Sequence, residues 1–264
     1  MKKTAFIGAG NMGGAIIFSL LKSPGFKKEN IFVCDKTPKK EMTDLGINFV
    51  SLKCAVESAD VIVLSVKPNV IFDVLADIKK CNTDGKTFIS IAAGVTIDSL
   101  KKALGTEKIV RVMPNLCLMA GEGMSVLARG GDVTDEEMLF AESIFKCAGK
   151  TAIVPENLID ACTSINGSGP AYVFMFIEAL TRAGIMQGID RETALSLTLQ
   201  TLIGAVKTVE KTGVDPEELK ERVCSPGGTT IEAVKVFEEK GLYSIVAEAV
   251  DACAKKAKLL SKKD

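Results

Sequence analysis

The amino-acid sequence predicts an α/β domain with a doubly wound, mostly parallel sheet, followed by an all-α domain. Over the first ~160 residues, short apolar runs alternate with helical patterns, as strand–helix–strand units require. A glycine-rich turn follows the first of these runs, and after Pro170 only helical periodicity remains. The chain of 264 residues is long enough for two modest domains, which we place at 1–162 and 163–264.

The expected strands are mostly apolar through their length, which is typical of parallel strands covered on both faces. They lie at Thr4–Ile7, Ile31–Cys34, Asn48–Val50, Val61–Val66, Thr87–Ile91 and Ile109–Met113, with shorter ones at Ser125–Leu127 and Thr151–Val154. Helices are expected at about 11–22, 70–80 and 134–147 in the first domain, and at about 171–187, 190–212, 216–222, 229–239 and 242–260 in the second. Pro170 and Pro216 suit the openings of two of these helices.

The composition excludes several classes of protein. Lys+Arg and Asp+Glu both number 33, so no basic excess points to nucleic acid. The most apolar run, Ala171–Ile177, is too short to span a membrane. The eight cysteines form no C-x-x-C pair and the chain has no histidine, so we expect no metal site. No signal peptide is recognisable, and we expect reduced thiols in a cytoplasmic protein.

The glycine-rich turn is the run Gly8-Ala9-Gly10-Asn11-Met12-Gly13, between the first strand and the first helix. Glycines there permit a tight turn and close backbone approach, and the helix N-terminus would face a pyrophosphate. We therefore predict a Rossmann-type, dinucleotide-binding domain in which Gly8, Gly10, Asn11, Met12 and Gly13 meet the cofactor. The alternative is a glycine turn that holds no ligand.

Asp35 follows the second strand, 22 residues after Gly13, where an acidic residue would bind the adenosine ribose. A carboxylate at this place favours NAD(H) and repels the 2′-phosphate of NADP(H). Lys36 and Thr37, followed by two further lysines, could hold that phosphate instead, or could simply form a solvated helix start. At this point the choice between the two cofactors stays open.

Other strand ends should reach the same cofactor, because ligands of such sheets bind outside the carboxyl ends of the strands. Three segments end strands in this way: Ser65-Val66-Lys67-Pro68, Ala92-Ala93-Gly94 and Met113-Pro114-Asn115. The candidate cofactor contacts among them are Ser65, Val66, Lys67, Pro68, Ala92 and Asn115. Ordinary strand endings are the alternative interpretation.

A second glycine-rich helix start reads Ser225-Pro226-Gly227-Gly228-Thr229-Thr230-Ile231-Glu232. Thr229 and Glu232 have the spacing of a capping box. The Gly-Gly pair leaves backbone N–H groups uncovered, which suits a small anion such as a carboxylate, and Thr230 offers a hydroxyl beside it. A further glycine-rich helix start is expected at Asn166–Pro170, as a hinge or as a wall of the substrate pocket.

The absence of histidine bears on the reaction. Reduction of a ketone usually needs a general acid of near-neutral pKa, and no lysine stands beside either of the last two glycine-rich helix starts. Reduction of a C=N bond needs less, because the imine can arrive protonated and requires only positioning and a hydrogen bond to its nitrogen. A small cyclic imine with a carboxylate would suit both the anion site and Thr230.

Six segments, spread over nearly the whole chain, carry a resemblance to a known family. They are Phe6–Gly13, Val66–Pro68, Ser90–Thr96, Met113–Asn115, Gly167–Tyr172 and Ser225–Ile231. In these segments the chain closely resembles the pyrroline-5-carboxylate reductases. The last segment is the highly specific signature of that family, whereas the first is shared with many dehydrogenases.

The resemblance implies the reduction of 1-pyrroline-5-carboxylate to L-proline, the last step of proline biosynthesis, by hydride transfer from NADPH or NADH, with NADPH favoured. It implies that Thr230 is the catalytic residue that bonds the ring nitrogen. Gly228, Thr229 and Glu156 join Thr230 in substrate binding. It also implies homodimers formed through the helical domain, with each site using both chains, and rings of five dimers.

The chain departs from the family pattern at two places. Leu116-Cys117 stand where Thr-Pro usually follows Met-Pro-Asn, and Arg222 could reach a cofactor phosphate or pair with Glu218. Two rival functions remain: a two-domain hydroxyacid dehydrogenase, for which Lys207 is the only mid-helix candidate in the second long helix, and a non-catalytic dinucleotide-binding sensor. Turnover would separate the sensor from both enzymes.

Overall fold

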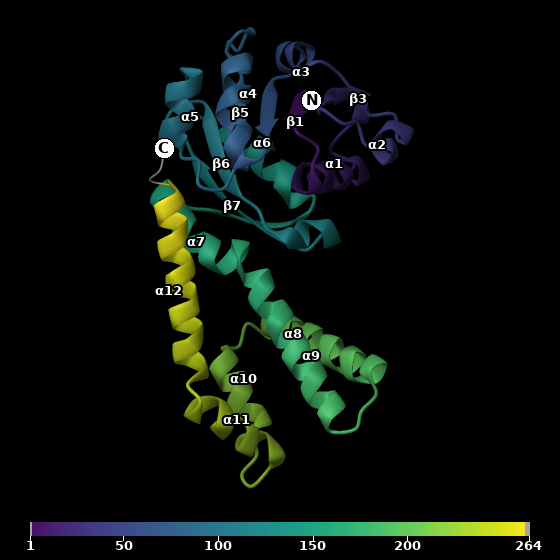
Figure 1. The fold of residues 1–264 in the computed structure, drawn as a ribbon, viewed down its shortest axis with the longest axis vertical. Helices are drawn as coiled ribbons and strands as arrows, with labels where there is room; N and C mark the ends of the chain where they lie inside the picture. The colour runs from purple at the N-terminus through teal and green to yellow at the C-terminus, as the bar shows by residue number, and fades with distance from the viewer. Residues whose placement is uncertain (1, 262–264) are drawn as a thin grey trace. The chain divides into compact units, whose positions relative to one another are not determined.

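Residues 2–261 are described by a computed structural model, in which the chain forms two compact units (Figure 1). The first contains residues 2–168 together with 253–261, and the second contains Gly169–Ala252. The helix that ends the described chain therefore contributes residues to both units. The assignment of residues 1–162 to cofactor binding and of residues 163–264 to dimerisation and substrate binding stays a prediction.

An eight-stranded sheet forms the centre of the first unit, in the order β3-β2-β1-β4-β5-β6-β7-β8. The strands are β1 (Thr4–Ile7), β2 (Ile31–Cys34), β3 (Asn48–Phe49), β4 (Val61–Leu64), β5 (Thr87–Ser90), β6 (Ile109–Met113), β7 (Gly123–Arg129) and β8 (Gly149–Ile153). All neighbours are parallel except β6 and β7. Ile7 pairs with Cys34 on one side and Leu64 on the other, so three carboxyl ends lie level. The predicted doubly wound, mostly parallel sheet is confirmed.

Helices cover both faces of the sheet (Figure 1). One face carries α1 (Asn11–Lys22), α2 (Lys40–Asp44) and α6 (Asp135–Lys146), and the other carries α3 (Leu52–Ser58), α4 (Ile71–Ile78) and α5 (Ile97–Leu104). Successive side chains of β1 alternate between the two cores: Phe6 packs with α1, while Ala5 and Ile7 pack on the opposite face. The near-continuous apolar character of the strands follows from this double cover.

Several boundaries differ from the sequence expectation. The expectation misses α2, α3 and α5, although Ser51 and Thr96 cap the latter two by accepting N–H bonds from Cys54 and Ser99. β7 and β8 are longer than expected, whereas β4 ends at Leu64 rather than Val66. Pro68 then opens the 3-10 helix η2 (Pro68–Val70), a position where its missing N–H costs nothing. The other 3-10 helices are η1 (Lys28–Asn30), η3 (Leu116–Ala120) and η4 (Glu156–Leu158).

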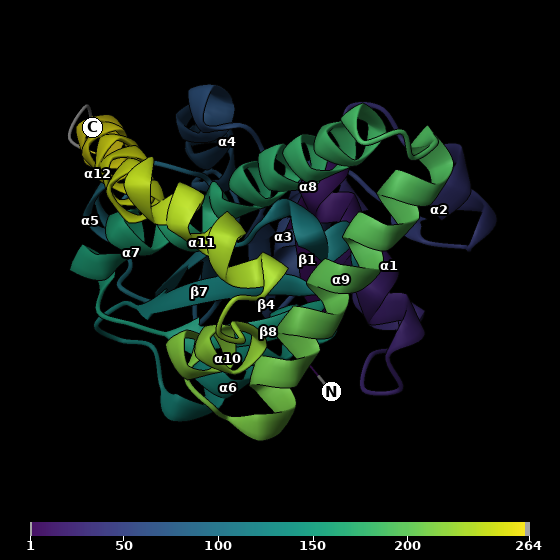
Figure 2. The same ribbon diagram turned by 90° about the horizontal axis from the view of Figure 1, so that it is seen from below.

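The second unit is helical, as predicted. It contains α8 (Gly169–Met186), α9 (Arg191–Thr212), α10 (Pro216–Val223), α11 (Thr229–Glu239) and the first part of α12 (Leu242–Ser261). α8 and α9 lie side by side (Figures 1 and 2). Asp190 caps α9 by accepting the Thr193 N–H, and Gly213, at φ +64°, closes it in the left-handed conformation.

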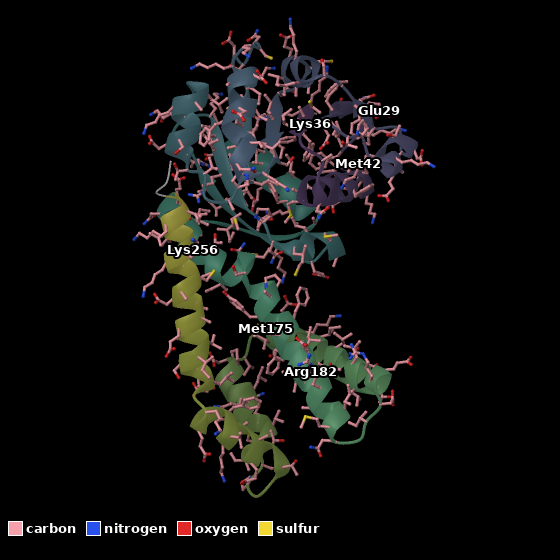
Figure 3. The ribbon with its side chains drawn as sticks, in the orientation of Figure 1. Glu29, Lys36, Met42, Met175, Arg182 and Lys256 are labelled. Carbon is pink, nitrogen blue, oxygen red and sulfur yellow. The ribbon has the colours of Figure 1, made fainter. Side chains whose placement is uncertain are left out.

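Apolar side chains of the second unit are largely uncovered. Among its residues only Thr181, Ala194 and Thr198 are buried. Met175, labelled on α8 in Figure 3, is 69% exposed, and its neighbours Val173 and Phe174 are more than half exposed. An apolar surface of this kind on a helical unit indicates an interaction surface rather than a finished core.

The helix start expected at Asn166–Pro170 is confirmed, because α8 begins at Gly169, but further helical turns precede it. α7 (Ile159–Cys162) runs into a π-helical turn, η5 (Thr163–Gly167), and α8 follows from Gly169, so the glycines lie within consecutive helical turns. Pro170 has no N–H to donate to the carbonyl of Asn166, four residues earlier. The Asn115 amide nitrogen donates to that carbonyl instead, at 3.0 Å.

Within residues 2–261, no helix combines the length and apolar character that crossing a membrane requires. All eight cysteines are free thiols.

Candidate functional site

A cleft of about 600 Å³ opens at the carboxyl ends of the central strands of the first unit. The ends of β1, β4, β5 and β6 supply its walls: Gly10, Asn11, Met12, Ser65, Val66, Lys67, Pro68, Ile91, Ala92, Ala93, Met113 and Pro114. The strand order reverses at this place, where ligands of doubly wound sheets bind. Most predicted cofactor contacts line this cleft. Gly8, Gly13, Asp35, Lys36, Thr37 and Asn115 do not.

The three glycines of the turn after β1 are required for different reasons. Gly8 has a φ of +100°, and a Cβ there would lie 2.7 Å from the carbonyl oxygen of Ser65. A Cβ on Gly13 would lie 2.6 Å from the carbonyl oxygen of Gly8, so glycine lets α1 pack closely against the sheet. A Cβ on Gly10 would meet no protein atom within 4 Å. The protein's own packing therefore leaves open space at Gly10, where a ligand can approach the backbone.

The N-terminus of α1 is open to an anion. Gly10 occupies the N-cap position and makes no side-chain capping bond. The N–H groups of the first turn therefore point out of the helix end uncapped, at the positive end of the helix dipole. Together with the open space at Gly10, this arrangement fits the pyrophosphate of a dinucleotide.

Asp35 holds the glycine turn from the end of β2. Its Oδ2 accepts the Ala9 N–H at 2.5 Å, and its Oδ1 accepts the Thr37 N–H at 2.9 Å. The side chains of Lys36 (labelled in Figure 3) and Thr37 are exposed beside it. Burial, and then the charge of Asp35, raise the pKa of the Cys34 thiol, which disfavours its reactive thiolate form.

Ser65 ties β4 to the same turn. Its hydroxyl donates to the Gly8 carbonyl oxygen at 2.5 Å and lies 3.2 Å from that of Ile7. Val66 is half-buried against the core, while Lys67 and Pro68 are exposed along the cleft wall. Ala92 follows the neighbouring strand β5 and is buried. These residues follow the ends of neighbouring strands, and they therefore line one cleft of ligand size.

Asn115 and Asn166 form a pair of side-chain-to-backbone links, so protein groups already engage the Asn115 side chain. Its Nδ2 donates to the Asn166 carbonyl oxygen, and its Oδ1 accepts the Met124 N–H at 3.2 Å. Asn166 Nδ2 in turn donates to the Met113 carbonyl oxygen at 2.8 Å. The pair joins the ends of β6 and β7 to the π-helical turn, so the Asn115 side chain fixes the loop whose backbone follows the cleft.

Glu156 is engaged by Arg111. The Arg111 side chain, on β6, is only 5% exposed and contacts Glu156 Oε1 at 3.2 Å and Asp160 Oδ1 at 2.9 Å. Glu156 Oε1 also accepts the Ile97 N–H, at the start of α5, at 2.7 Å. A substrate that reaches Glu156 would therefore have to use its other oxygen, Oε2.

The start of α11 is the open helix end of the second unit. Gly228 N–H donates to the Ser225 carbonyl oxygen at 3.0 Å across a turn with Pro226 second and Gly227 third, and Gly227 has a φ of +71°. Proline and a positive-φ glycine at these positions are typical of a type II turn. Gly228 is the N-cap and makes no side-chain capping bond, so the first N–H groups of α11 stay available.

The capping box expected at Thr229 and Glu232 is wrong. Thr229 is the first residue of the helix rather than its cap, and Glu232 pairs with Lys235 at 2.7 Å. Glycine at the N-cap displaces the threonine by one position, which removes the box geometry. Thr229 is exposed and Thr230 is half-buried in the first turn.

Three further candidates are placed by the structure. Arg222 pairs with Glu218 at 2.6 Å, the second of its two expected interactions. Lys207 is exposed on α9, and Leu116 and Cys117 begin the 3-10 helix η3. Within residues 2–261, no three His, Cys, Asp or Glu side chains are grouped as metal binding requires.

Sequence reasoning missed Arg111 and Asn166. The signal for Arg111 is a lone charge inside the apolar run Ile109-Val110-Arg111-Val112-Met113. A buried arginine in a strand needs carboxylate partners, but the sequence alone does not say which ones fold back onto β6. Asn166 gave no local signal, because its role depends on the missing N–H of Pro170 and on Asn115.

Two family models match separate parts of the chain. The family model "Pyrroline-5-carboxylate reductase dimerisation" matches residues 156–260, and "NADP oxidoreductase coenzyme F420-dependent" matches residues 3–94. The pyrroline-5-carboxylate reductase of Escherichia coli (strain K12) is 41% identical, over 99% of both chains.

Solved structures agree. A pyrroline-5-carboxylate reductase from Coxiella burnetii has a TM-score of 0.93 and 34% identity, covering 99% of both chains. A Plasmodium falciparum pyrroline carboxylate reductase with NADP bound has a TM-score of 0.90 and 33% identity, covering 99% of this chain and 98% of that one. With this identity over its full length, the chain belongs to the pyrroline-5-carboxylate reductase family.

Proposed function

We propose that this protein reduces the C=N bond of 1-pyrroline-5-carboxylate to L-proline, with NADPH or NADH as hydride donor, as the last step of proline biosynthesis. The observation that carries the proposal is the start of α11. There, a glycine turn leaves the N–H groups of an uncapped helix open, with Thr230 in the first turn. Family membership supplies the substrate that fits this arrangement.

The α11 start has the two features that the imine needs. Its free N–H groups, including that of Thr229, and the positive end of the helix dipole bind the ring carboxylate. Gly228 leaves that approach free of a side chain. The Thr230 hydroxyl accepts a hydrogen bond from the protonated ring nitrogen and so orients the C=N bond. Glu156, through Oε2, is a second candidate substrate ligand.

The cleft of the first unit holds the dinucleotide in this proposal. The cofactor, when bound, supplies the hydride. The turn Gly8–Gly13 with the N-terminus of α1 binds its pyrophosphate, and Ser65–Pro68, Ala92 and the loop at Asn115 form the walls around the rest. Asp35 is placed for the adenosine ribose, and Lys36 and Thr37 for a 2′-phosphate. We propose that both cofactors are used, with NADPH preferred.

The assembly is a homodimer through the helical unit. Its support is the exposed apolar surface of α8 and the dimerisation model that matches residues 156–260. A ring of five dimers is the larger assembly that we propose, in a cytoplasmic setting. Sedimentation velocity would give the mass of the particle, and a monomer at micromolar concentration would contradict the assembly.

The test of the activity is loss of dihydronicotinamide absorbance with 1-pyrroline-5-carboxylate, measured with NADPH and with NADH. We expect oxidation with both and a higher kcat/KM for NADPH. Oxidation with a 2-keto acid but not with the imine would favour the hydroxyacid dehydrogenase. Tight dinucleotide binding without turnover of either substrate would favour the sensor.

Thr230→Ala tests the site itself. Loss of one transition-state hydrogen bond should lower kcat about 10- to 100-fold. Thr229→Ala is the matched control, because the adjacent threonine acts through its backbone N–H, which alanine retains. Equal kinetics for the two variants would remove Thr230 from the proposed role.

A further inference from the structure

The segment that joins β5 to α5 forms one wall of the dinucleotide cleft. Ile91, Ala92 and Ala93 line the cleft, and Gly94 follows with a φ of +78°. α5 then begins at Ile97. The position of this short segment therefore sets the shape of the cleft wall.

The last turn of α12 packs against the same segment. A Cβ built on Gly94 would lie 3.3 Å from Leu260 Cβ and 3.6 Å from the Leu260 carbonyl carbon. The end of α12 also lies beside α7 in both views (Figures 1 and 2). These residues all belong to the first unit, although α12 begins in the second.

Arg111 joins the end of α12 to α7. One guanidinium nitrogen, Nη2, contacts Asp160 Oδ1 at 2.9 Å and Ser261 Oγ at 3.4 Å. The Ser261 hydroxyl donates to the same Asp160 oxygen at 2.9 Å. Arg111, Asp160 and Ser261 thus form one hydrogen-bonded cluster, in which the arginine side chain is nearly buried.

Glu156 connects the same arginine to the start of α5. Arg111 Nη1 donates to Glu156 Oε1, which also accepts the Ile97 N–H. The segment 91–97 is therefore held at two points: Gly94 lies against Leu260, and Ile97 is bonded to Glu156. Arg111 connects to both points: it contacts Ser261, which follows Leu260, and it bonds Glu156, which accepts the Ile97 N–H.

We propose that Arg111 and Ser261 are positioning residues for the dinucleotide cleft, through which the C-terminal turn of α12 holds the 91–97 wall in its binding position. The inference rests on the proposed function in one respect, that the cleft receives the dinucleotide. Neither residue touches the ligand. If the Arg111–Asp160–Ser261 cluster is weakened, the 91–97 segment becomes more mobile. Ordering that segment on binding then lowers the affinity for the dinucleotide.

The experiment compares three variants of the full chain. Ser261→Ala removes the hydroxyl, Ser261→Thr retains one, and Lys258→Ala alters an exposed side chain on the same last turns. The Kd of NADPH is measured by dihydronicotinamide fluorescence without substrate, together with amide hydrogen exchange over residues 91–97. For Ser261→Ala we expect an approximately three- to tenfold weaker Kd and faster exchange at Ile97. Ser261→Thr and Lys258→Ala should stay within about twofold of the parent.

An unchanged Kd with unchanged exchange in Ser261→Ala would overturn the proposal. So would equal weakening by Ser261→Thr, because the hydroxyl would then not matter. Arg111→Lys gives a second check. It keeps the positive charge but loses the two guanidinium nitrogens that bond Glu156 and Asp160 separately, so amide exchange at Ile97 should become faster in the folded protein. If the parent protein bound neither NADPH nor NADH, the proposed function would fail, and the exchange data would still decide whether Ser261 holds the wall.

Discussion

α1 and α11 begin in similar ways and are supported differently. Both follow glycine-rich turns, and both have glycine at the N-cap with no side-chain capping bond. Yet the turn before α1 is held by Ser65 and Asp35, and Cβ atoms at Gly8 and Gly13 would collide with backbone. Before α11, a Cβ at Gly227 would meet no atom within 4 Å, although its φ is +71°. A Cβ at Gly228 would meet the rotatable hydroxyl of Ser225 at 2.5 Å and the Ser225 carbonyl oxygen at 3.1 Å.

The difference teaches that a glycine-rich helix start carries two separate requirements. At α1, two glycines serve the packing of the fold, and Gly10 alone leaves space for a ligand. At α11, Gly227 serves the turn through its positive φ, and Gly228 leaves the helix end uncovered. A substitution therefore has different expected effects at different glycines of one motif: a stability defect where the backbone or the packing requires glycine, and a binding defect at Gly10 and Gly228.

The largest expected effect is that of Gly13→Ala. Its Cβ would meet the Gly8 carbonyl oxygen, which belongs to a turn fixed on two sides, so the loss of unfolding free energy should be about 3 kcal/mol. Gly10→Ala is the matched control and should cost at most about 1 kcal/mol, for the poorer N-cap, while weakening NADPH binding at least about tenfold. Urea unfolding and NADPH titration separate the two effects. Equal destabilisation by both variants would contradict the division of roles.

A capped helix start provides the reference for the two open ones. At α6, Thr134 and Glu137 form a complete capping box, and Glu137 also accepts bonds from Thr87 and Lys108. Burial alone would raise the pKa of Glu137, but the hydrogen bonds from Lys108, the Thr134 N–H and hydroxyl, and Thr87 outweigh it and lower the pKa from 4.5 to about 2.

Glu137→Gln should therefore lower the unfolding free energy by about 2 kcal/mol at pH 7, within the ~3 kcal/mol that a shift of this size allows. Because the folded pKa lies below the unfolded one, this contribution is complete above pH 4.5 and is lost as the pH falls toward 2. Unfolding at pH 7, 5.5 and 3.5 would show the difference between variant and parent shrinking only at the lowest pH. A constant difference would mean that packing rather than charge is responsible.

Asp35→Ser tests the residue that holds the turn before α1. It removes the carboxylate that accepts the Ala9 N–H and that would repel a 2′-phosphate. We expect the ratio of kcat/KM for NADPH over NADH to rise about tenfold, with weaker binding of NADH. Steady-state kinetics with both cofactors measures it. An unaltered ratio would show that Asp35 serves only the turn and not the ribose.

Much of the first unit could be predicted because its signals are local. Apolar runs such as Val61–Leu64 need two covered faces, and the turn after β1 needs glycine. The cleft followed from these two facts, since level strand ends place Ser65 and Ala92 around it. Arg111 and Asn166 could not be placed, because their partners lie from 42 to 150 residues away in the chain and only folding brings them together.

The smallest expected effect tests the motif that misled the sequence interpretation. Thr134–Glu137 and Thr229–Glu232 have the same spacing, but only the former builds a capping box. Glycine precedes Thr229 and takes the N-cap, so Glu232 faces solvent and pairs with Lys235, an exposed pair of little stabilising value.

Glu232→Ala should accordingly change the unfolding free energy by less than about 0.5 kcal/mol at pH 7, against about 2 kcal/mol for Glu137→Gln. Urea unfolding of both variants in one buffer makes the comparison direct. A cost near 1 kcal/mol for Glu232→Ala would mean that the box forms in solution, because alanine, unlike glutamine, cannot accept the N-cap N–H. The α11 N-terminus would then be partly covered, and its N–H groups would not be free for a carboxylate.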